Sequence, residues 1–213
     1  MSNFRRNPYP VGLQRILRRG LRVTIIPLWD CNFSCEYCCR KDDGSFPTGD
    51  VKSLDQWKRF ITDLNGTFKR DRLKIKEIIL TGGEPTLLPY FKQLCDWILD
   101  QGFILVVYTN LSNTKKLKSI RKSFRLRIHT THHPGFFSEA KFNKNLLDVM
   151  SVHNVVVDEI GERRLSSCPI KTKLKPYGSD EQIRWGLSSL RVEPDFAINI
   201  YCIPLQMINN ETN

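Results

Sequence analysis

The chain has 213 residues, of which 40% are hydrophobic and 26% are charged. This composition suits one globular domain with a sizeable core, and it excludes a disordered or collagen-like chain. No apolar stretch approaches the roughly 20 residues that a membrane-spanning helix needs, and the Arg-rich start lacks the apolar core of a secretory signal. We therefore expect a soluble cytoplasmic protein without a membrane partner, in the host cytoplasm if the source is a virus.

Positive charge is in excess and is unevenly distributed. Lysine and arginine number 33 against 22 for aspartate and glutamate, which gives a formal net charge of +11. Two long stretches, before Asp30 and between Asp100 and Glu139, contain no acidic residue. Such stretches fit contact with a nucleic acid or another anion, and they fit an ordinary solvated surface about equally well.

Seven cysteines are an odd number in a chain too long to need disulfide bonds for stability. We therefore expect a reducing compartment, and cysteines that serve as metal ligands or reactive thiols.

Short β-branched stretches alternate with amphipathic ones, which predicts repeated βα units around a parallel sheet. Six strands with helical crossovers are fewer than the eight of a full barrel, so we predict an α/β fold with an open, partial (β/α)6 barrel and outer helices. Functional residues should then gather at the carboxyl ends of the strands. The predicted strands are 23–26, 75–80, 103–108, 126–130, 154–157 and 196–201.

Two helices can be predicted in detail. The first begins at a capping box formed by Ser53 and Gln56, and we expect Gly66 to end it. The second runs through residues 91–99 and ends before Gly102, where a left-handed residue is wanted. Cys95 lies on the inward face of this helix and is predicted to be inert core.

A cysteine-rich loop follows the first predicted strand. Cys31, Cys35 and Cys38 lie at spacings of four and three, so one loop can wrap a single metal centre. Thiolates at this density select zinc or an iron–sulfur cluster, and three ligands on a four-iron cube leave one iron open. The alternative is a structural zinc site completed by Cys39, His132 or His133.

The second predicted strand ends in Gly82, Gly83, Glu84 and Pro85. Two glycines at this edge allow backbone to approach a ligand closely, and the adjacent carboxylate could accept hydrogen bonds from an ammonium group.

Together these motifs make the sequence resemble the radical S-adenosylmethionine (radical SAM) superfamily. Its Cys-x3-Cys-x2-Cys loop is matched by Cys31, Cys35 and Cys38, the aromatic residue before the third cysteine by Tyr37, and its Gly-Gly-Glu-Pro motif by residues 82–85. The resemblance covers roughly residues 23–157. We therefore expect a basic N-terminal segment, 1–22, followed by one radical SAM domain, 23–213.

The resemblance implies a [4Fe–4S] cluster on the three cysteines, with S-adenosylmethionine on the fourth iron, and a 5′-deoxyadenosyl radical that abstracts hydrogen from a substrate. It implies a reductase or flavodoxin-type electron donor. Glu84 and the backbone of Gly82 and Gly83 would orient the methionine ammonium group, and Tyr37 would pack near the adenine. Position alone suggests contacts to the ribose and carboxylate for Thr109, Asn110, His129 and Thr131.

Several residues stay open at this point. Cys39 adjoins Cys38 and could replace it as the third ligand, although Cys38 keeps the family spacing. His129, His132 and His133 cluster after the fourth predicted strand, where they could bind phosphate, move a proton, ligate a metal or form a structural turn. Hydrogen-atom donation to a product radical and burial in the core are both open for Cys168, Cys202 and Tyr201.

The substrate is the least determined feature, because no sequence rule decodes the loops that choose it. The basic surface favours a radical enzyme that modifies or isomerises a nucleobase in nucleic acid or a nucleotide. One version resembles the compact phage enzymes of thymidine hypermodification, which rearrange a glycyl adduct on thymine. The alternatives are a radical SAM enzyme acting on a peptide or sugar, and a non-catalytic zinc or iron–sulfur protein that binds nucleic acid.

Overall fold

The computed structural model describes residues 20–35, 38, 51–70 and 73–158, and the backbone alone of 159–160 and three further strands. Within these parts of the chain, none of the helices has the length and apolar character needed to cross a bilayer. Several residues discussed above lie outside the described residues. These are the basic segment up to residue 19 and Tyr37, Cys39, Cys168, Tyr201 and Cys202.

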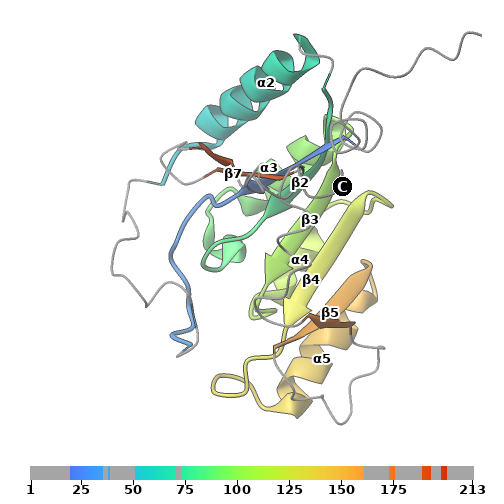
Figure 1. Cartoon of the computed structure of the whole chain (residues 1–213). Helices are drawn as coiled ribbons and strands as arrows, with labels where there is room; N and C mark the ends of the chain where they lie inside the picture. Colours follow the sequence, from blue (N-terminus) through green and yellow to red (C-terminus); the bar gives the residue numbers. More distant parts are fainter. Residues whose placement is uncertain are drawn as a thin grey trace, which may run out of the picture.

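One sheet organises the molecule, with the strand order β6-β5-β4-β3-β2-β1-β7-β8. Every neighbouring pair is parallel except β7 and β8, which are antiparallel. The order is linear, so the sheet is open, and the predicted α/β fold with a partial barrel of parallel strands is confirmed (Figure 1). The strands are β1 (Leu21–Ile25), β2 (Ile75–Leu80), β3 (Ile104–Thr109), β4 (Leu126–Thr131), β5 (Val155–Ile160), β6 (Lys173–Lys175), β7 (Ser189–Val192) and β8 (Ile198–Ile200).

The sheet differs from the sequence prediction at both edges. The stretch 196–201 was expected to add a parallel strand, but its central residues form β8, which runs antiparallel to β7. β6 and β7 were not predicted, because strands of three and four residues that contain lysine or arginine show no apolar pattern. β7 pairs with β1, so β1 lies inside the sheet and not at its edge.

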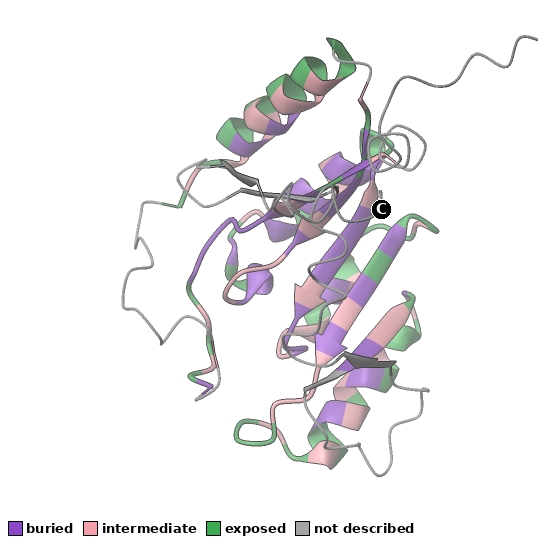
Figure 2. Cartoon of the chain, viewed as in Figure 1, coloured by how far each residue is buried: buried purple, intermediate pink, exposed green. Residues whose placement is uncertain are grey.

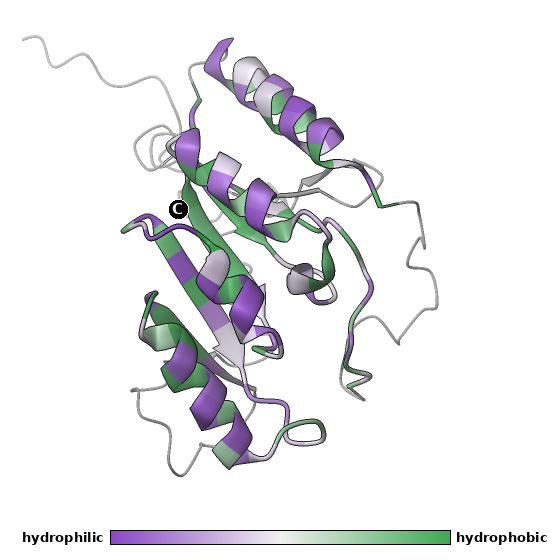
Figure 3. Cartoon of the chain, turned by 180° about the vertical axis from the view of Figure 1, so that it is seen from behind, coloured by the Kyte–Doolittle hydropathy of each residue, from purple (hydrophilic) through white to green (hydrophobic). Residues whose placement is uncertain are grey.

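The helices cover one face of the sheet. Seen from behind, α3, α4 and α5 lie in front of the strands (Figure 3). α3 contacts β3, and α5 contacts β5. α2 packs against α3. The helices are α2 (Leu54–Arg70), the short 3-10 helix η2 (Pro85–Leu87), α3 (Phe91–Asp100), α4 (Thr114–Ser119) and α5 (Glu139–Met150).

The predicted capping box at the start of α2 is confirmed. The Ser53 backbone N–H donates to Gln56 Oε1 at 2.8 Å, and the Gln56 N–H donates to Ser53 Oγ at 3.2 Å. The predicted end of this helix is wrong, because α2 continues through Gly66 to Arg70. A single glycine lowers the stability of a helix but does not have to end it. Phe68, two residues after Gly66, still packs against the core.

The core lies between the sheet and the helices, where α3 contributes a fully buried face. Cys95 is completely buried, and burial raises the pKa of its thiol well above the ordinary value. Gly102, which follows α3, adopts φ +84, the left-handed conformation predicted for it. Figure 2 shows the buried stripe along α3 and the largely exposed surface of α2. The buried residues of α3 are Phe91, Leu94, Cys95, Ile98 and Leu99.

Side chains on the other face of the sheet are more polar. In β4, Leu126, Ile128 and Thr130 are buried on the helix side, and the alternate residues Arg127, His129 and Thr131 point the opposite way. The register places Tyr108 of β3 beside His129, and Thr131 beside Asp158 of β5. We call this surface, defined by Tyr108, Arg127, His129, Thr131 and Asp158, the open face.

Gly66 offers a test of the helix boundary. A Cβ atom at this position would meet no atom within 4 Å. Gly66→Ala should therefore stabilise the protein by about 0.5–1 kcal/mol, because alanine loses less conformational freedom in a helix. Urea unfolding followed by circular dichroism under anaerobic conditions measures this, and a destabilised variant would contradict a continuous helix.

Candidate functional site

The cysteine loop leaves β1 at the carboxyl edge of the sheet, where β2, β3 and β4 also end. Cys35 is buried, Cys31 and Cys38 are half-buried, and none of the three forms a disulfide. The Cys38 backbone N–H donates to the Cys35 carbonyl at 3.2 Å, which turns the loop back on itself. The structure therefore places the predicted ligands at the predicted edge.

Backbone hydrogen bonds join this loop to the Gly-Gly-Glu segment. The Thr81 N–H donates to the Ile25 carbonyl at 3.1 Å, Gly83 donates to Leu28 at 3.2 Å, and Glu84 donates to Asp30 at 2.8 Å. The pairing of β1 with β2 thus continues beyond both strands and into the two motifs. Because the bonds are between backbone groups, the position of one motif fixes the position of the other.

The two glycines are needed for this approach. A Cβ atom on Gly83 would lie 2.0 Å from the Asp30 carbonyl oxygen, and one on Gly82 would lie 2.5 Å from that of Leu28. Gly82 also adopts φ +124, which only glycine reaches readily. The sequence led us to expect room for a ligand here. In the structure, the cysteine loop's own backbone fills the space over the glycines.

Glu84 is completely buried and holds three segments together. Its Oε1 accepts hydrogen bonds from the Thr86 N–H at 3.0 Å, the Thr86 hydroxyl at 2.6 Å and the Thr109 hydroxyl at 2.8 Å. Its Oε2 accepts from the Asn110 N–H at 2.7 Å. The carboxylate therefore ties β2 and η2 to the end of β3, with fewer protein donors on Oε2 than on Oε1.

Asn110 extends this network to the cysteines. Its side-chain Nδ2 donates to Asn32 Oδ1 at 2.9 Å and lies 3.9 Å from Cys31 Sγ. The next residue, Leu111, is fully buried at φ +64, a strained conformation for a branched side chain. The Thr109 hydroxyl accepts from the Leu111 N–H at 3.1 Å and supports this turn, so that hydroxyl is engaged within the protein.

The three thiols and Glu84 influence one another electrostatically. Burial raises the pKa of the Cys31 thiol, and the Phe33 N–H, donated to its sulfur at 3.4 Å, lowers it. The charges of Glu84, Cys35 and Cys38 raise the pKa of Cys31 further. A metal centre would offset the mutual repulsion of these groups as thiolates.

His133 contacts the same loop. Its Nδ1 lies 3.3 Å from Cys35 Sγ, and its ring meets Phe33 edge to face at 5.6 Å. Burial and the neighbouring His132 lower the pKa of His133 to about 4. The imidazole is therefore neutral near pH 7.

The other two histidines have different surroundings. His132 Nε2 lies 2.9 Å from the Phe137 carbonyl, which supports the structural turn that the sequence left open for this residue. His129 lies on the open face, with its Nδ1 3.0 Å from Asp158 Oδ2 and its ring 4.9 Å from that of Tyr108. The sequence did not point to Asp158 as its partner, because the two residues are joined only by strand pairing.

No three His, Cys, Asp or Glu side chains among the described residues lie close enough together to bind a single metal ion. A four-iron cube is wider than one ion and takes thiolates that lie farther apart. The soft donor set, the free thiols of Cys31, Cys35 and Cys38 and their shared position at the sheet edge fit such a cube.

Part of the basic stretch after α3 is paired with acids within the fold. Lys118 pairs with Asp148 and Arg121 with Asp100. Lys116 Nζ is held by the carbonyls of Thr86 and Leu88 and keeps its charge. In the described part of the chain, no acidic partner pairs with Lys115, Lys116, Lys122 or Arg125. This stretch therefore offers less free positive charge than the sequence indicates.

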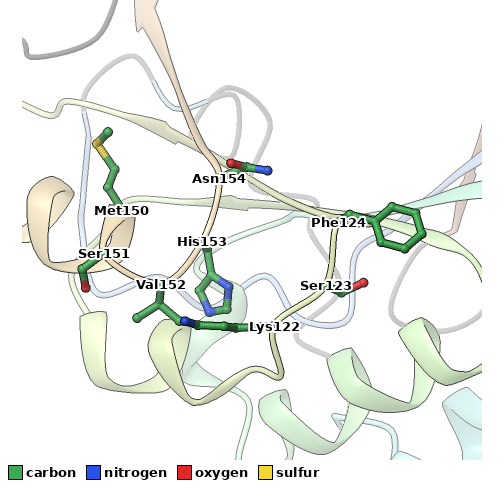
Figure 4. Close-up of a pocket in the computed structure, with 8 residues that line it drawn as sticks. All are labelled: Lys122, Ser123, Phe124, Met150, Ser151, Val152, His153 and Asn154. Atoms are coloured by element: carbon green, nitrogen blue, oxygen red, sulfur yellow. The ribbon is translucent and has the colours of Figure 1, made fainter.

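A hollow lies at the opposite edge of the sheet, as Figure 4 shows. It is lined by residues 122–124, which precede β4, and by residues 150–154, which precede β5. Because these segments lie at the amino ends of the strands, the hollow is separate from the cysteine loop.

The Glu84 network can be tested by Glu84→Gln. The amide would present N–H groups to at least one of the buried donors, so the variant should lose about 3 kcal/mol of stability. Asp55→Asn is the matched control, since Asp55 has a side chain that is 87% exposed and a long ion pair with Lys58. In urea unfolding, this control should lose less than about 0.5 kcal/mol of stability. Equal stabilities of the two variants would contradict the network.

The close approach of the two motifs can be tested by Gly83→Ala. The new methyl group would collide with backbone that has little freedom to move, and the loss should be at least about 2 kcal/mol. Gly66→Ala provides the glycine control in open space. A Gly83→Ala variant as stable as the unaltered chain would show that the loops can separate at no cost.

Three curated proteins match parts of this chain. The chain resembles a Methanocaldococcus jannaschii protein named as a glycyl-radical enzyme activating enzyme, with 33% identity over 90 residues, 42% of this chain and 31% of the relative. It resembles the 7-carboxy-7-deazaguanine synthase of Neisseria meningitidis, with 30% identity over 91 residues, 43% of this chain and 37% of the relative.

A third curated protein and one solved structure also match the chain. The S-adenosylmethionine-dependent nucleotide dehydratase of Selenomonas ruminantium is 32% identical over 80 residues, 38% of this chain and 26% of that protein. The chain thus spans about a third of the length of these relatives. Streptococcus suis SuiB bound to S-adenosylmethionine has 13% identity and a TM-score of 0.48, with 93% of this chain and 65% of that one covered.

The family model "Radical SAM superfamily" matches residues 25–133, which is more than half of the chain. The matched region contains both the cysteine loop and the Gly-Gly-Glu-Pro segment. Membership brings with it a [4Fe–4S] cluster and S-adenosylmethionine, the two cofactors that the family resemblance implies. The chain belongs to the radical SAM superfamily.

Proposed function

We propose that this protein is a radical SAM enzyme that modifies or isomerises a nucleobase, in nucleic acid or in a nucleotide. In this proposal Cys31, Cys35 and Cys38 hold the cluster, and S-adenosylmethionine binds beside Glu84, Gly82 and Gly83. The bound cofactors would supply a 5′-deoxyadenosyl radical, after an electron arrives from a reductase or flavodoxin-type donor.

The observation that carries the proposal is the chemistry of the open face. Tyr108 and His129 present neighbouring rings, and Asp158 holds the imidazole by its Nδ1. Within the described residues, nothing hydrogen-bonds to Nε2 of His129. A planar heterocycle could stack on the aromatic pair while Nε2 contacts one of its polar edge atoms.

Charge on the open face adds to this argument. Arg127 lies two residues before His129 on β4, and its side chain is about half exposed. Glu77 is 3.9 Å from Arg127 and 2.9 Å from Arg22, so two arginines share one carboxylate. Arg127, which Glu77 holds only at the longer of these two distances, suits a phosphate attached to the base.

The names of two relatives point to the same class of substrate. One is a deazaguanine synthase and another a nucleotide dehydratase. Rearrangement of a glycyl group on thymine, as in phage DNA hypermodification, remains the specific version that we favour.

In this proposal the chain's own residues position the cofactors and exclude water from them. Asn110 links the cysteine loop to the end of β3, and the Glu84 network keeps this edge rigid. Rigid walls around the cofactor would prevent the radical from attacking other groups. In this proposal Tyr37 would pack near the adenine, and Thr131 would contact the ribose or carboxylate.

A substrate screen tests the proposal. Anaerobically reconstituted protein is mixed with S-adenosylmethionine, dithionite and one candidate substrate at a time. We expect a new base product, and more 5′-deoxyadenosine, with nucleotides or with DNA containing 5-substituted thymine. Products formed only from peptides or sugar phosphates would contradict the proposal.

Two cysteine variants serve as controls in this screen. Cys35→Ala should lose the cluster and all cleavage of S-adenosylmethionine. Cys95→Ala should keep both, because Cys95 belongs to α3 and is buried in the core, outside the cysteine loop. Colourless protein that contains zinc would support the non-catalytic alternative.

A further inference from the structure

The contact between His133 and Cys35 is a feature that the proposed function does not use. The Nδ1 atom of His133 lies 3.3 Å from the sulfur of Cys35, a distance at which sulfur forms hydrogen bonds. Cys35 is the most buried of the three cysteines, at 8% exposure. The contact is therefore shielded from water, which would otherwise compete for it.

The histidine ring is held in place by the loop after β4. The Phe136 and Phe137 N–H groups donate to the His133 carbonyl at 2.9 and 3.1 Å, which folds the loop into a tight turn. Phe33 of the cysteine loop stacks on Phe136 at 4.6 Å and meets Phe137 edge to face at 5.2 Å. These aromatic contacts keep the two loops together and keep His133 on Cys35.

The direction of the hydrogen bond follows from the chemistry of a cluster ligand. A cysteine that binds iron is a thiolate, which accepts hydrogen bonds and has no proton to donate. The imidazole must therefore carry a proton on Nδ1 to bond to this sulfur.

We infer that His133 donates its Nδ1–H to the Cys35 thiolate and so raises the reduction potential of the cluster. Reduction adds one electron from the external donor and no proton, which makes the cluster more negative. A donor to a ligand sulfur stabilises that more negative state more than the oxidised one. His133 is thus a positioning residue. The inference rests on Cys35 being a cluster ligand and is independent of the substrate.

Two substitutions separate the hydrogen bond from the shape of the ring. His133→Phe keeps an aromatic ring among Phe33, Phe136 and Phe137 but has no N–H group. His133→Asn places an amide N–H near the position of Nδ1. His132→Gln is the matched control, because the amide can keep the contact to the Phe137 carbonyl and His132 does not touch the thiol.

The measurement is a redox titration followed by EPR, on reconstituted protein without S-adenosylmethionine. At a fixed potential, His133→Phe should lower the ratio of reduced to oxidised cluster about tenfold, which is about 59 mV for one electron. His133→Asn should recover part of this loss, and His132→Gln should match the unaltered protein. Full iron content with an unchanged potential in His133→Phe would overturn the inference.

A second measurement needs no variant, in case His133→Phe fails to bind iron. Pulsed EPR on the reduced, unaltered protein labelled with [15N]histidine should detect weak coupling between the cluster spin and one histidine nitrogen. Absence of this coupling would overturn the inference. A coupling as strong as that of a nitrogen bound directly to iron would overturn it too, since His133 would then be a ligand.

Discussion

The buried carboxylate of Glu84 is the interaction on which the rest of the site depends. It accepts four hydrogen bonds from Thr86, Thr109 and Asn110, while its own backbone N–H donates to Asp30 in the cysteine loop. A buried carboxylate without these donors would be very costly. The arrangement of the sheet edge that satisfies Glu84 is therefore strongly preferred, and that arrangement brings β2, β3 and the cysteine loop together.

The sequence predicted the parts of the site that are local in the chain. Three cysteines within eight residues and four consecutive residues of a second motif can be recognised together by their resemblance to the family. It could not predict that Glu84 would reach Thr109 and Asn110, or that His129 would meet Asp158, because strand pairing creates these contacts. The glycines were predicted for closeness to a ligand, and the structure shows closeness to another loop.

The fold shows the same division. The capping box and the pattern of α3 depend on neighbours within one or two turns, so the sequence predicts them well. The expected stop at Gly66 was wrong because packing of Phe68 outweighs the low helix propensity of one glycine. Likewise, the acid-free stretch after Asp100 fitted a binding surface and an ordinary solvated surface about equally well, and acids outside the stretch pair with Lys118 and Arg121.

The central claim is that three thiolates hold one cube and leave one iron open beside Glu84. EPR spectra of the anaerobically reduced protein, with and without S-adenosylmethionine, test this directly. The account predicts about four irons per chain and a [4Fe–4S] signal whose g values change when S-adenosylmethionine is added. A signal that S-adenosylmethionine leaves unchanged would mean that no iron is open to it, and would contradict the account.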